Sequence, residues 1–274
     1  MNLIQLDASN LSLLNKIKSA KTKKVKKILL EKTIGSISKT SKMPCYSYSI
    51  PAKNCNIGSI LRKVKKSVCY FCYAMKGTYV FPIVKLALEK RLKSLKNPLW
   101  HLFLIEWIKI TNKTNLFRFF DSGDLQNFKH LVKIVKVVNA LPKITFWLPT
   151  KEYKLIDKYL EYREFPKNLV VRKSAFLIGQ ISNFKNVNTS SVNVNEKKST
   201  KFNFQCSAYK TVKIDNKFKV FQSKTLAMAF INKYYSKTIN DKSNKKKSSD
   251  FIGFCGNCKA CWNKNLININ YPIH

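Results

Sequence analysis

Seven of the eight cysteines fall into two groups, and these groups constrain the fold more than any other feature of the sequence. The first group is Cys55, Cys69 and Cys72, in the stretch CNIGSILRKVKKSVCYFC. Two cysteines separated by two residues direct both sulfurs towards one metal centre. Two occupants fit this loop. One is an iron–sulfur cluster with one iron free of a protein ligand, and the other is a zinc ion with a fourth ligand from elsewhere in the chain.

The second group is formed by Cys206 and by three cysteines near the end of the chain, Cys255, Cys258 and Cys261, in CGNCKAC. Four thiolates close a metal site completely, and they suit zinc and a [4Fe–4S] cluster equally well. Cys45 falls outside the paired spacings, so we expect it to be a small buried residue. Clustered cysteines in a reducing compartment indicate metal binding more often than disulfides.

Strand patterns alternate with helical patterns through the middle of the chain, which predicts an α/β fold with a parallel sheet. Right-handed crossovers bring the residues that follow each strand to one edge of such a sheet. We therefore expect the first cysteine group to lie beside the DSGD turn at 121–124 and the polar residues at 150–151 and 172–174. The expected strands span 46–50, 116–120, 144–149 and 168–176, and the expected helices 82–96, 98–111, 128–138, 152–162 and 224–235.

Composition divides the chain into three parts. Residues 1–44 form a lysine-rich lead-in, whose weak helical pattern indicates a solvated helix. Residues 45–205 form the α/β core, and the Asn- and Ser-rich stretch 181–200 predicts a loop or irregular strands. Residues 206–274 form a cysteine-rich segment with a lysine-rich insertion at about 209–250, and the end of that insertion, NDKSNKKKSSD, is typical of solvated disorder.

The net charge is +38, with 52 lysines and arginines against 14 acidic residues. This excess favours a polyanionic partner, a nucleic acid or nucleotide, with Arg118, Arg172 and the N-terminal lysines around the site. Compositional drift of the genome is the alternative, and it would scatter lysines over every exposed face. No apolar run approaches the roughly 20 residues that span a membrane, and the N-terminus lacks a signal-peptide pattern. We therefore expect a cytoplasmic protein with no membrane partner.

Six stretches identify a resemblance to a family. They are KTSKMPCYSYSIPAKNC, CYFCYAMKGTYVFP, FRFFDSGDLQ, FWLPTKE, NLVVRKSA and CGNCKACW. In this order, from about residue 37 to the end, they resemble a phage protein family that is named after gene product eighty-eight and is described as radical-SAM-like. The resemblance implies a phage protein that acts in the infected host cell. The stretch between Cys206 and Cys255 is longer than is usual in that family, in agreement with an insertion.

The first cysteine group is similar to the loop of radical S-adenosylmethionine (SAM) enzymes, although its first gap is longer. This resemblance implies an incomplete parallel (β/α) barrel of radical SAM type, with the second group as a C-terminal four-cysteine appendage. It also implies a [4Fe–4S] cluster on Cys55, Cys69 and Cys72, with SAM at the open iron. The DSGD turn stands where those enzymes bind the amino group of SAM, and one of its aspartates is expected to cap the next helix. The residues expected around SAM are Tyr73, Asp121, Ser122, Gly123, Asp124, Thr150, Arg172 and Ser174.

The function expected from these features is that of a radical-SAM-like enzyme that takes an electron from a donor and modifies a nucleic acid or nucleotide. The second group would then hold a structural or electron-relaying cluster. The alternative is a non-catalytic zinc protein that binds nucleic acid, in which Cys45 completes the first site. The identity of the bound metal, iron or zinc, distinguishes these two hypotheses.

Overall fold

The computed structural model describes residues 3–181, 184, 187–193, 204–214, 217–235 and 251–272. Its centre is a sheet in the order β1-β2-β3-β4-β5-β6-β10-β7. β1 runs antiparallel to β2, and all the other neighbouring strands are parallel. The strands are β1 (Ser38–Lys39), β2 (Tyr46–Tyr48), β3 (Leu116–Phe119), β4 (Thr145–Thr150), β5 (Leu169–Ser174), β6 (Asn188–Asn193), β7 (Phe204–Gln205) and β10 (Asn268–Pro272). The α/β class and the mostly parallel sheet are therefore confirmed.

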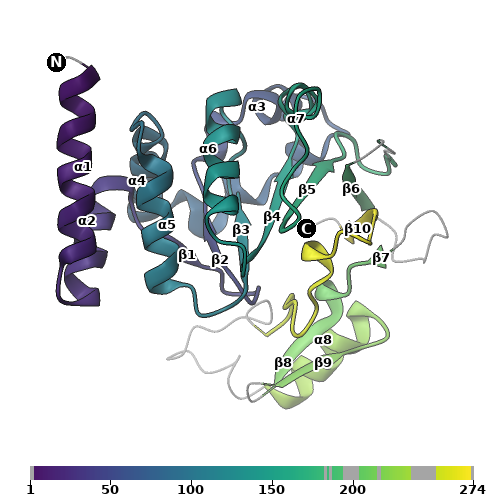
Figure 1. Cartoon of the computed structure of the whole chain (residues 1–274). Helices are drawn as coiled ribbons and strands as arrows, with labels where there is room; N and C mark the ends of the chain where they lie inside the picture. Colours follow the sequence, from purple (N-terminus) through teal and green to yellow (C-terminus); the bar gives the residue numbers. More distant parts are fainter. Residues whose placement is uncertain are drawn as a thin grey trace.

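Helices cover one face of this sheet, as Figure 1 shows for α5, α6 and α7. The strands β2 to β6 follow one another in chain order, so right-handed crossovers return to the same face each time. Phe117, Phe119 and Phe146 point from the strands into the core beneath these helices. The helices are α4 (Pro82–Ser94), α5 (Trp100–Thr111), α6 (Phe128–Asn139) and α7 (Tyr153–Leu160).

The sequence of α6 shows why this layer forms. The side chain of Asn127 accepts a hydrogen bond from the backbone N–H of His130 at 2.9 Å, which caps the first turn. Leu131, Ile134 and Val138 recur at helical spacing and are fully buried against the sheet. The expected cap by an aspartate of the DSGD turn is therefore wrong, because the helix begins after Asn127 rather than directly after Asp124.

The lysine-rich lead-in packs more closely than its composition indicates. It forms α1 (Leu3–Ser19) and α2 (Lys23–Ile34), which lie side by side in Figure 1. Leu14, Ile17, Leu30 and Ile34 are buried in the same hydrophobic core as the strands. The lysines occupy the remaining faces, so the expectation of a solvated helix holds for the polar side of each helix alone.

The cysteine-rich end of the chain is not an appendage. β10 lies between β6 and β7 in the main sheet, so the sheet extends beyond residue 205, the expected end of the core. The stretch 188–193, within the expected loop, is the buried strand β6, whose Thr189 hydroxyl accepts a hydrogen bond from the side chain of Asn268 at 2.6 Å. This polar stretch forms an internal strand, paired in parallel with β5 and β10.

The insertion contains a small unit of its own. β8 (Thr211–Ile214) and β9 (Lys217–Val220) form a hairpin beside α8 (Lys224–Tyr234). Val212, Ala227, Ile231 and Ile252 form its separate hydrophobic core. The expected disorder at residues 240–250 lies outside the described residues. None of the helices in the described ranges is long and apolar enough to cross a membrane.

Candidate metal centres

The first cysteine group lies in the segment that follows β2, at the carboxyl edge of the sheet. Cys55 immediately precedes α3 (Asn56–Leu61), Cys69 lies within η2 (Val68–Phe71), and Cys72 separates η2 from η3 (Tyr73–Met75). The backbone N–H of Val68 donates to the carbonyl of Phe176 at 2.9 Å. This bond attaches the cysteine loop to the segment that follows β5.

Gly58 leaves space next to two of these sulfurs. A Cβ atom at this position would lie 3.6 Å from the Sγ atoms of both Cys55 and Cys69, and 2.9 Å from the Cβ of Cys55. Glycine is therefore the residue that keeps this side of the thiol group open. Gly58 lies three residues after Cys55 on α3, on the same side of that helix.

The electrostatics of the first group disfavour free thiolates. Burial raises the pKa of the Cys55 thiol, and Asp124 and the neighbouring sulfurs raise it further. Burial also raises the pKa of Cys69, against the opposing effect of the Lys151 ammonium. Several buried thiols that raise one another's pKa become favourable as thiolates when a metal cation lies between them.

Asp124 connects the DSGD turn to the end of β4. Its carboxylate accepts hydrogen bonds from the Thr150 hydroxyl at 2.5 Å and from the backbone N–H groups of Lys151 and Leu125, both at 2.8 Å. Burial raises its pKa to about 6. Asp124 and Thr150 thus hold two loops together at the edge of the sheet, with their polar atoms bonded to one another.

Ser122 and Gly123 fix the turn against the end of β2. The Ser122 hydroxyl donates to the carbonyl of Ile50 at 2.9 Å, and the Ile50 N–H donates back to the Ser122 carbonyl at 3.1 Å. Gly123 has φ +86°, and a Cβ there would lie 2.4 Å from Ile50 Cγ1 and 2.6 Å from the Ile50 carbonyl oxygen. The close backbone approach that Gly123 permits is to Ile50, whereas we expected it to be to a ligand.

Replacing Gly123 with alanine is therefore expected to lower the free energy of unfolding by about 3 kcal/mol or more, because backbone strain of about 1–3 kcal/mol adds to a clash with backbone. Gly77 offers a matched control. Its φ is +60°, and no atom lies within 4 Å of a Cβ built there. Gly77→Ala should lower the free energy of unfolding only by the strain of the backbone, about 1–2 kcal/mol. Denaturant unfolding measures both variants, and equal losses would contradict the proposed contact with Ile50.

Asp121 is the member of the turn that belongs to a polar cluster beside the first group. It accepts a hydrogen bond from Arg118 Nη1 at 2.9 Å and another from the Tyr79 hydroxyl. Arg118 Nη2 also donates to the hydroxyl of Tyr73, the residue after Cys72, at 3.4 Å. Arg118 stacks 4.5 Å above the Trp147 ring. Asp121, Arg118 and Tyr73 thus lie together next to the last cysteine of the loop.

Arg172 lies away from this cluster, contrary to the expectation that it faces the same site. Its side chain is fully buried beneath the C-terminal segment. The guanidinium donates to the carbonyls of Cys261, Leu266, Asn263, Ala260 and Thr189. Ser174, at the end of β5, accepts a hydrogen bond from the hydroxyl of Ser190 at 3.2 Å. Both side chains therefore have structural partners.

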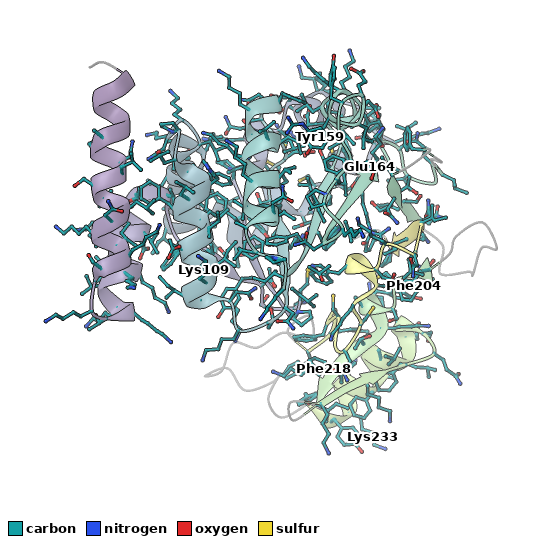
Figure 2. All side chains as sticks on the ribbon, viewed as in Figure 1. Lys109, Tyr159, Glu164, Phe204, Phe218 and Lys233 are labelled. Carbon is teal, nitrogen blue, oxygen red and sulfur yellow. The ribbon has the colours of Figure 1, made fainter. Side chains whose placement is uncertain are left out.

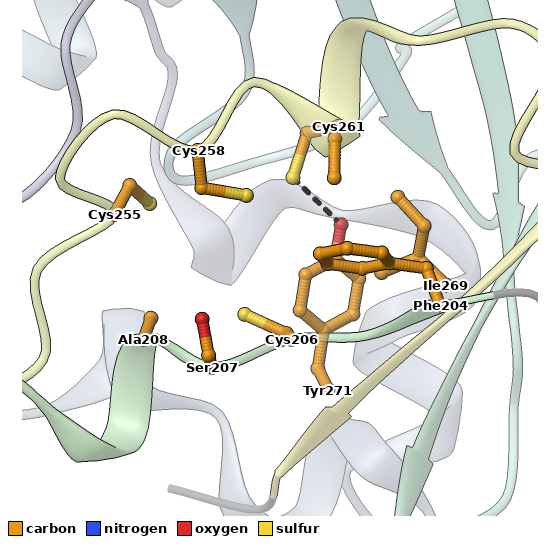
Figure 3. Close-up of a pocket in the computed structure, with 10 residues that line it drawn as sticks. Phe204, Cys206, Ser207, Ala208, Cys255, Cys258, Cys261, Ile269 and Tyr271 are labelled. Atoms are coloured by element: carbon orange, nitrogen blue, oxygen red, sulfur yellow. Dashed lines mark hydrogen bonds between the residues drawn. The ribbon is translucent and has the colours of Figure 1, made fainter. Parts of the chain in front are cut away.

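The four cysteines of the second group surround one small cavity, as Figure 3 shows. Cys206 follows β7, and Cys255, Cys258 and Cys261 approach from the opposite side. The Tyr271 hydroxyl lies 3.0 Å from Cys261 Sγ. Burial raises the pKa of Cys206 to about 12 and that of Cys261 above its usual value. The cavity measures about 10 Å³, close to the volume that one water molecule or ion occupies.

The second group lies on the face of the sheet opposite the helices. Trp262 packs against Trp147, with ring centroids 5.5 Å apart, and its indole N–H donates to the carbonyl of Phe117 at 2.9 Å. Cys45 lies in this same hydrophobic cluster, together with Leu116 and Cys261. Cys45 is thus the small buried residue that we expected, and it lies apart from the first group.

All the cysteines are free thiols. Among the described residues, no three Cys, His, Asp or Glu side chains have the geometry of a single bound metal ion. A cubane cluster separates its thiolate ligands more widely than a single ion does, because each thiolate binds a different iron. The charges of Cys69 and Cys72 act on the Cys55 thiol, and Gly58 leaves space beside the sulfurs of Cys55 and Cys69.

Sequence reasoning missed Gly58 beside the first group and Tyr79 beside Asp121, whereas Lys151 lies next to the first group as expected. Gly58 is one of only seven glycines, and its place three residues after Cys55 was an available signal. Lys151 Nζ donates to the carbonyl of Ala175 at 3.0 Å, and its charge acts on the thiols of Cys69 and Cys55. No local pattern indicated Tyr79, which reaches Asp121 across the fold.

The fold and these sites define an α/β protein with a mostly parallel sheet and two separate groups of free cysteines, one at the carboxyl edge and one on the face opposite the helices. The chain belongs to the Gene product 88 family, whose match covers residues 12–264. This agrees with the resemblance to a family of phage gene products. No curated protein and no solved structure matched the chain.

Proposed function

We propose that this protein is an enzyme that binds a [4Fe–4S] cluster on Cys55, Cys69 and Cys72 and cleaves SAM reductively. The supporting observation is a group of three thiols without a fourth protein ligand in the described part of the chain. Cys45 lies in another cluster, and the Asp124 carboxylate is bonded to Thr150, Lys151 and Leu125. Three protein ligands leave one position for a small molecule.

The sheet supports this proposal at the level of architecture. Its strands β2 to β6 follow chain order and are parallel, which is the order of an incomplete (β/α) barrel. In barrels of this kind the loops after the strands form the active site. The cysteine loop follows β2, the DSGD turn follows β3, and Lys151 follows β4.

When bound, such a cluster would supply the electron for the reductive cleavage of SAM, which would in turn allow hydrogen abstraction from a substrate. In this proposal, the residues of this chain bind SAM and orient it. Asp121 offers a carboxylate to an ammonium group, with Arg118 holding it in place. Tyr73 lies beside it, and Lys151 offsets the charge of the thiolates. Ser122, Gly123, Asp124 and Thr150 position the loops through contacts with one another and with Ile50.

Product analysis tests this proposal. Anaerobically purified protein, reduced with dithionite and supplied with SAM, is expected to form 5′-deoxyadenosine and methionine in equal amounts, measured by chromatography with mass detection. Cys69→Ala should abolish both products, because it removes a cluster ligand, whereas Cys45→Ala should retain them. Failure of the wild-type protein, loaded with iron and sulfide, to form either product would overturn the proposal.

The second group supports a second metal centre, because its four cysteines line one cavity. Four thiolates suit zinc and a [4Fe–4S] cluster equally well, so we propose a structural or electron-relaying centre at this site. The alternative function places zinc in both groups and makes the chain a non-catalytic protein that binds nucleic acid. A fourth ligand for zinc in the first group would then have to come from a partner or from outside the described ranges.

The surface of the cysteine loop supports single-stranded nucleic acid as the substrate class. Tyr70, Phe71 and Phe81 are each about half exposed, with fractions of 48%, 41% and 55%. Exposed lysines lie between and beside them in the chain, at Lys63, Lys65, Lys66 and Lys76. Aromatic side chains stack on bases, and nearby cations neutralise phosphates. Charge and stacking surfaces therefore occur together next to the first group.

Replacing Phe71 with alanine is expected to weaken binding of a single-stranded oligonucleotide about 5- to 150-fold, because stacking of one base contributes about 1–3 kcal/mol. Tyr162, which is 76% exposed after α7 and outside the cysteine loop, gives the control Tyr162→Ala, which should bind like the wild type. Fluorescence anisotropy at fixed salt measures both affinities. Equal affinities for the two variants would mean that binding depends on diffuse charge.

A further inference from the structure

A second, cysteine-free groove lies between the β1–β2 edge of the sheet and α4. Its volume is about 410 Å³, within the range of about 300–1,000 Å³ that is usual for small-molecule sites. Part of its wall is apolar, formed by Ile83, Val84 and Ala87 of α4. The rest is rich in hydroxyl groups, from Ser38, Thr40, Ser41, Ser47, Ser49, Thr78 and Tyr79.

Arg91 places a buried positive charge in the lining of this groove. Its side chain is only 5% exposed, and its Nε has no hydrogen-bond partner. Its Nη2 donates to the hydroxyls of Ser38 at 3.0 Å and Ser36 at 3.4 Å. No carboxylate in the described ranges forms an ion pair with it. Burial lowers the pKa of this arginine, and the charge of Glu31 offsets that effect only partly.

The serines around Arg91 have hydroxyl protons to donate. Ser47 is fully buried, and its Oγ has no partner. Ser38 Oγ accepts from Arg91, and Ser49 Oγ accepts from the backbone N–H of Asp121 at 3.0 Å. A hydroxyl that already accepts one hydrogen bond retains its own proton for another acceptor. The lining thus offers a buried guanidinium and several hydroxyl groups that can donate hydrogen bonds, but it contains few hydrogen-bond acceptors.

We propose that this groove binds a small phosphate ester, with its phosphate at Arg91 and the serine hydroxyls and its organic part against the apolar wall of α4. A phosphate brings several strong acceptors, and a guanidinium binds it through paired N–H donors. Lys39 lines the groove too and adds positive charge. Asp121 lies at another point of the lining, where Arg118 and Tyr79 already bind its carboxylate. This site does not depend on a metal in either cysteine group.

Isothermal titration of the full-length protein with adenosine monophosphate, inorganic phosphate and adenosine tests the proposal. Adenosine monophosphate should bind most tightly, phosphate more weakly, and adenosine weakest of all, because the phosphate supplies the charged contacts. The same order identifies an ester rather than free phosphate as the ligand class. If neither phosphate compound binds at millimolar concentration, or if adenosine binds as well as its monophosphate, the proposal is wrong.

Two serines provide a matched pair of variants. Ser47 in β2 and Ser191 in β6 are both fully buried, and the hydroxyls of both have no partner. Ser47→Ala should weaken binding of adenosine monophosphate about tenfold, the effect of one lost hydrogen bond of about 1.4 kcal/mol, without lowering the melting temperature. Ser191→Ala should leave the affinity unchanged. Equal affinities of Ser47→Ala, Ser191→Ala and the wild type would overturn the proposal.

Discussion

Replacing Arg172 with methionine is expected to lower the free energy of unfolding by at least about 3 kcal/mol, because each hydrogen bond to a charged group contributes about 1.5–3 kcal/mol. The guanidinium is fully buried, and it binds five backbone carbonyls, four of them in the segment that carries Cys261 and Trp262. Methionine fills much of the same space but leaves these carbonyls without donors. Denaturant unfolding, followed by tryptophan fluorescence, measures the loss.

Arg163→Met is the control for this prediction. Arg163 is exposed beyond α7, and surface substitutions usually change stability by less than about 0.5 kcal/mol. Both variants remove one positive charge. A difference between their free energies of unfolding therefore reports the buried contacts of Arg172. A loss below about 1 kcal/mol in Arg172→Met would mean that water or other donors replace the guanidinium, and Arg172 would then be free for another role.

Cys258→Ser is expected to remove the metal of the second group and to lower the melting temperature, while the first group keeps its cluster. The reason is that metal binding in such segments contributes folding free energy directly. Cys255, Cys258 and Cys261 face Cys206 across one cavity (Figure 3), so the loss of one ligand disrupts the whole site. Elemental analysis for iron and zinc, together with sulfide analysis, measures the result.

Cys45→Ala serves as the comparison, since Cys45 is a buried cysteine outside both groups, in the hydrophobic cluster with Leu116 and Trp147. It should retain all of the metal that the wild type binds. Unchanged metal content in Cys258→Ser would show that the four cysteines do not form one centre. Loss of both metals in that variant would show that the two groups fold as one unit.

The strands of the core were predictable because they are short apolar runs with strong β-propensity. LFRF falls within the expected range 116–120, TFWLPT extends one residue beyond the expected range 144–149, and both strands are mostly buried. The strands at the far side of the sheet were not predictable in this way. β6 has the sequence NTSSVN, and it is a strand because it pairs with β5 and β10, where Asn268 donates to the Thr189 hydroxyl.

The site could be predicted in outline, since the spacing of the cysteines fixes which of them group together. The direction of individual side chains could not. Arg172 and Lys173 are neighbours on β5, and successive side chains point to opposite faces of a sheet. Arg172 therefore lies beneath Cys261, whereas Lys173 pairs with Asp157 of α7 at 2.5 Å. Sequence alone does not indicate which face the C-terminal segment covers.

The positive charge is spread widely over the molecule. In Figure 2 Lys109 on α5 and Lys233 on α8 lie at well-separated positions. The +38 charge is therefore not confined to one face of the molecule. The lysines that our proposal uses are those next to exposed aromatic side chains in the cysteine loop, since stacking and charge together distinguish a nucleic-acid surface from a merely basic one.

Electron paramagnetic resonance of anaerobically reduced Cys258→Ser protein tests whether Cys55, Cys69 and Cys72 hold a [4Fe–4S] cluster with an open iron. In this variant the first group is the expected source of an iron–sulfur signal. We expect the spectrum of one reduced [4Fe–4S] cluster whose g values shift when SAM is added, because SAM takes the open position left by Cys55, Cys69 and Cys72. A spectrum that SAM leaves unchanged, or a colourless protein that contains zinc in place of iron, would contradict it.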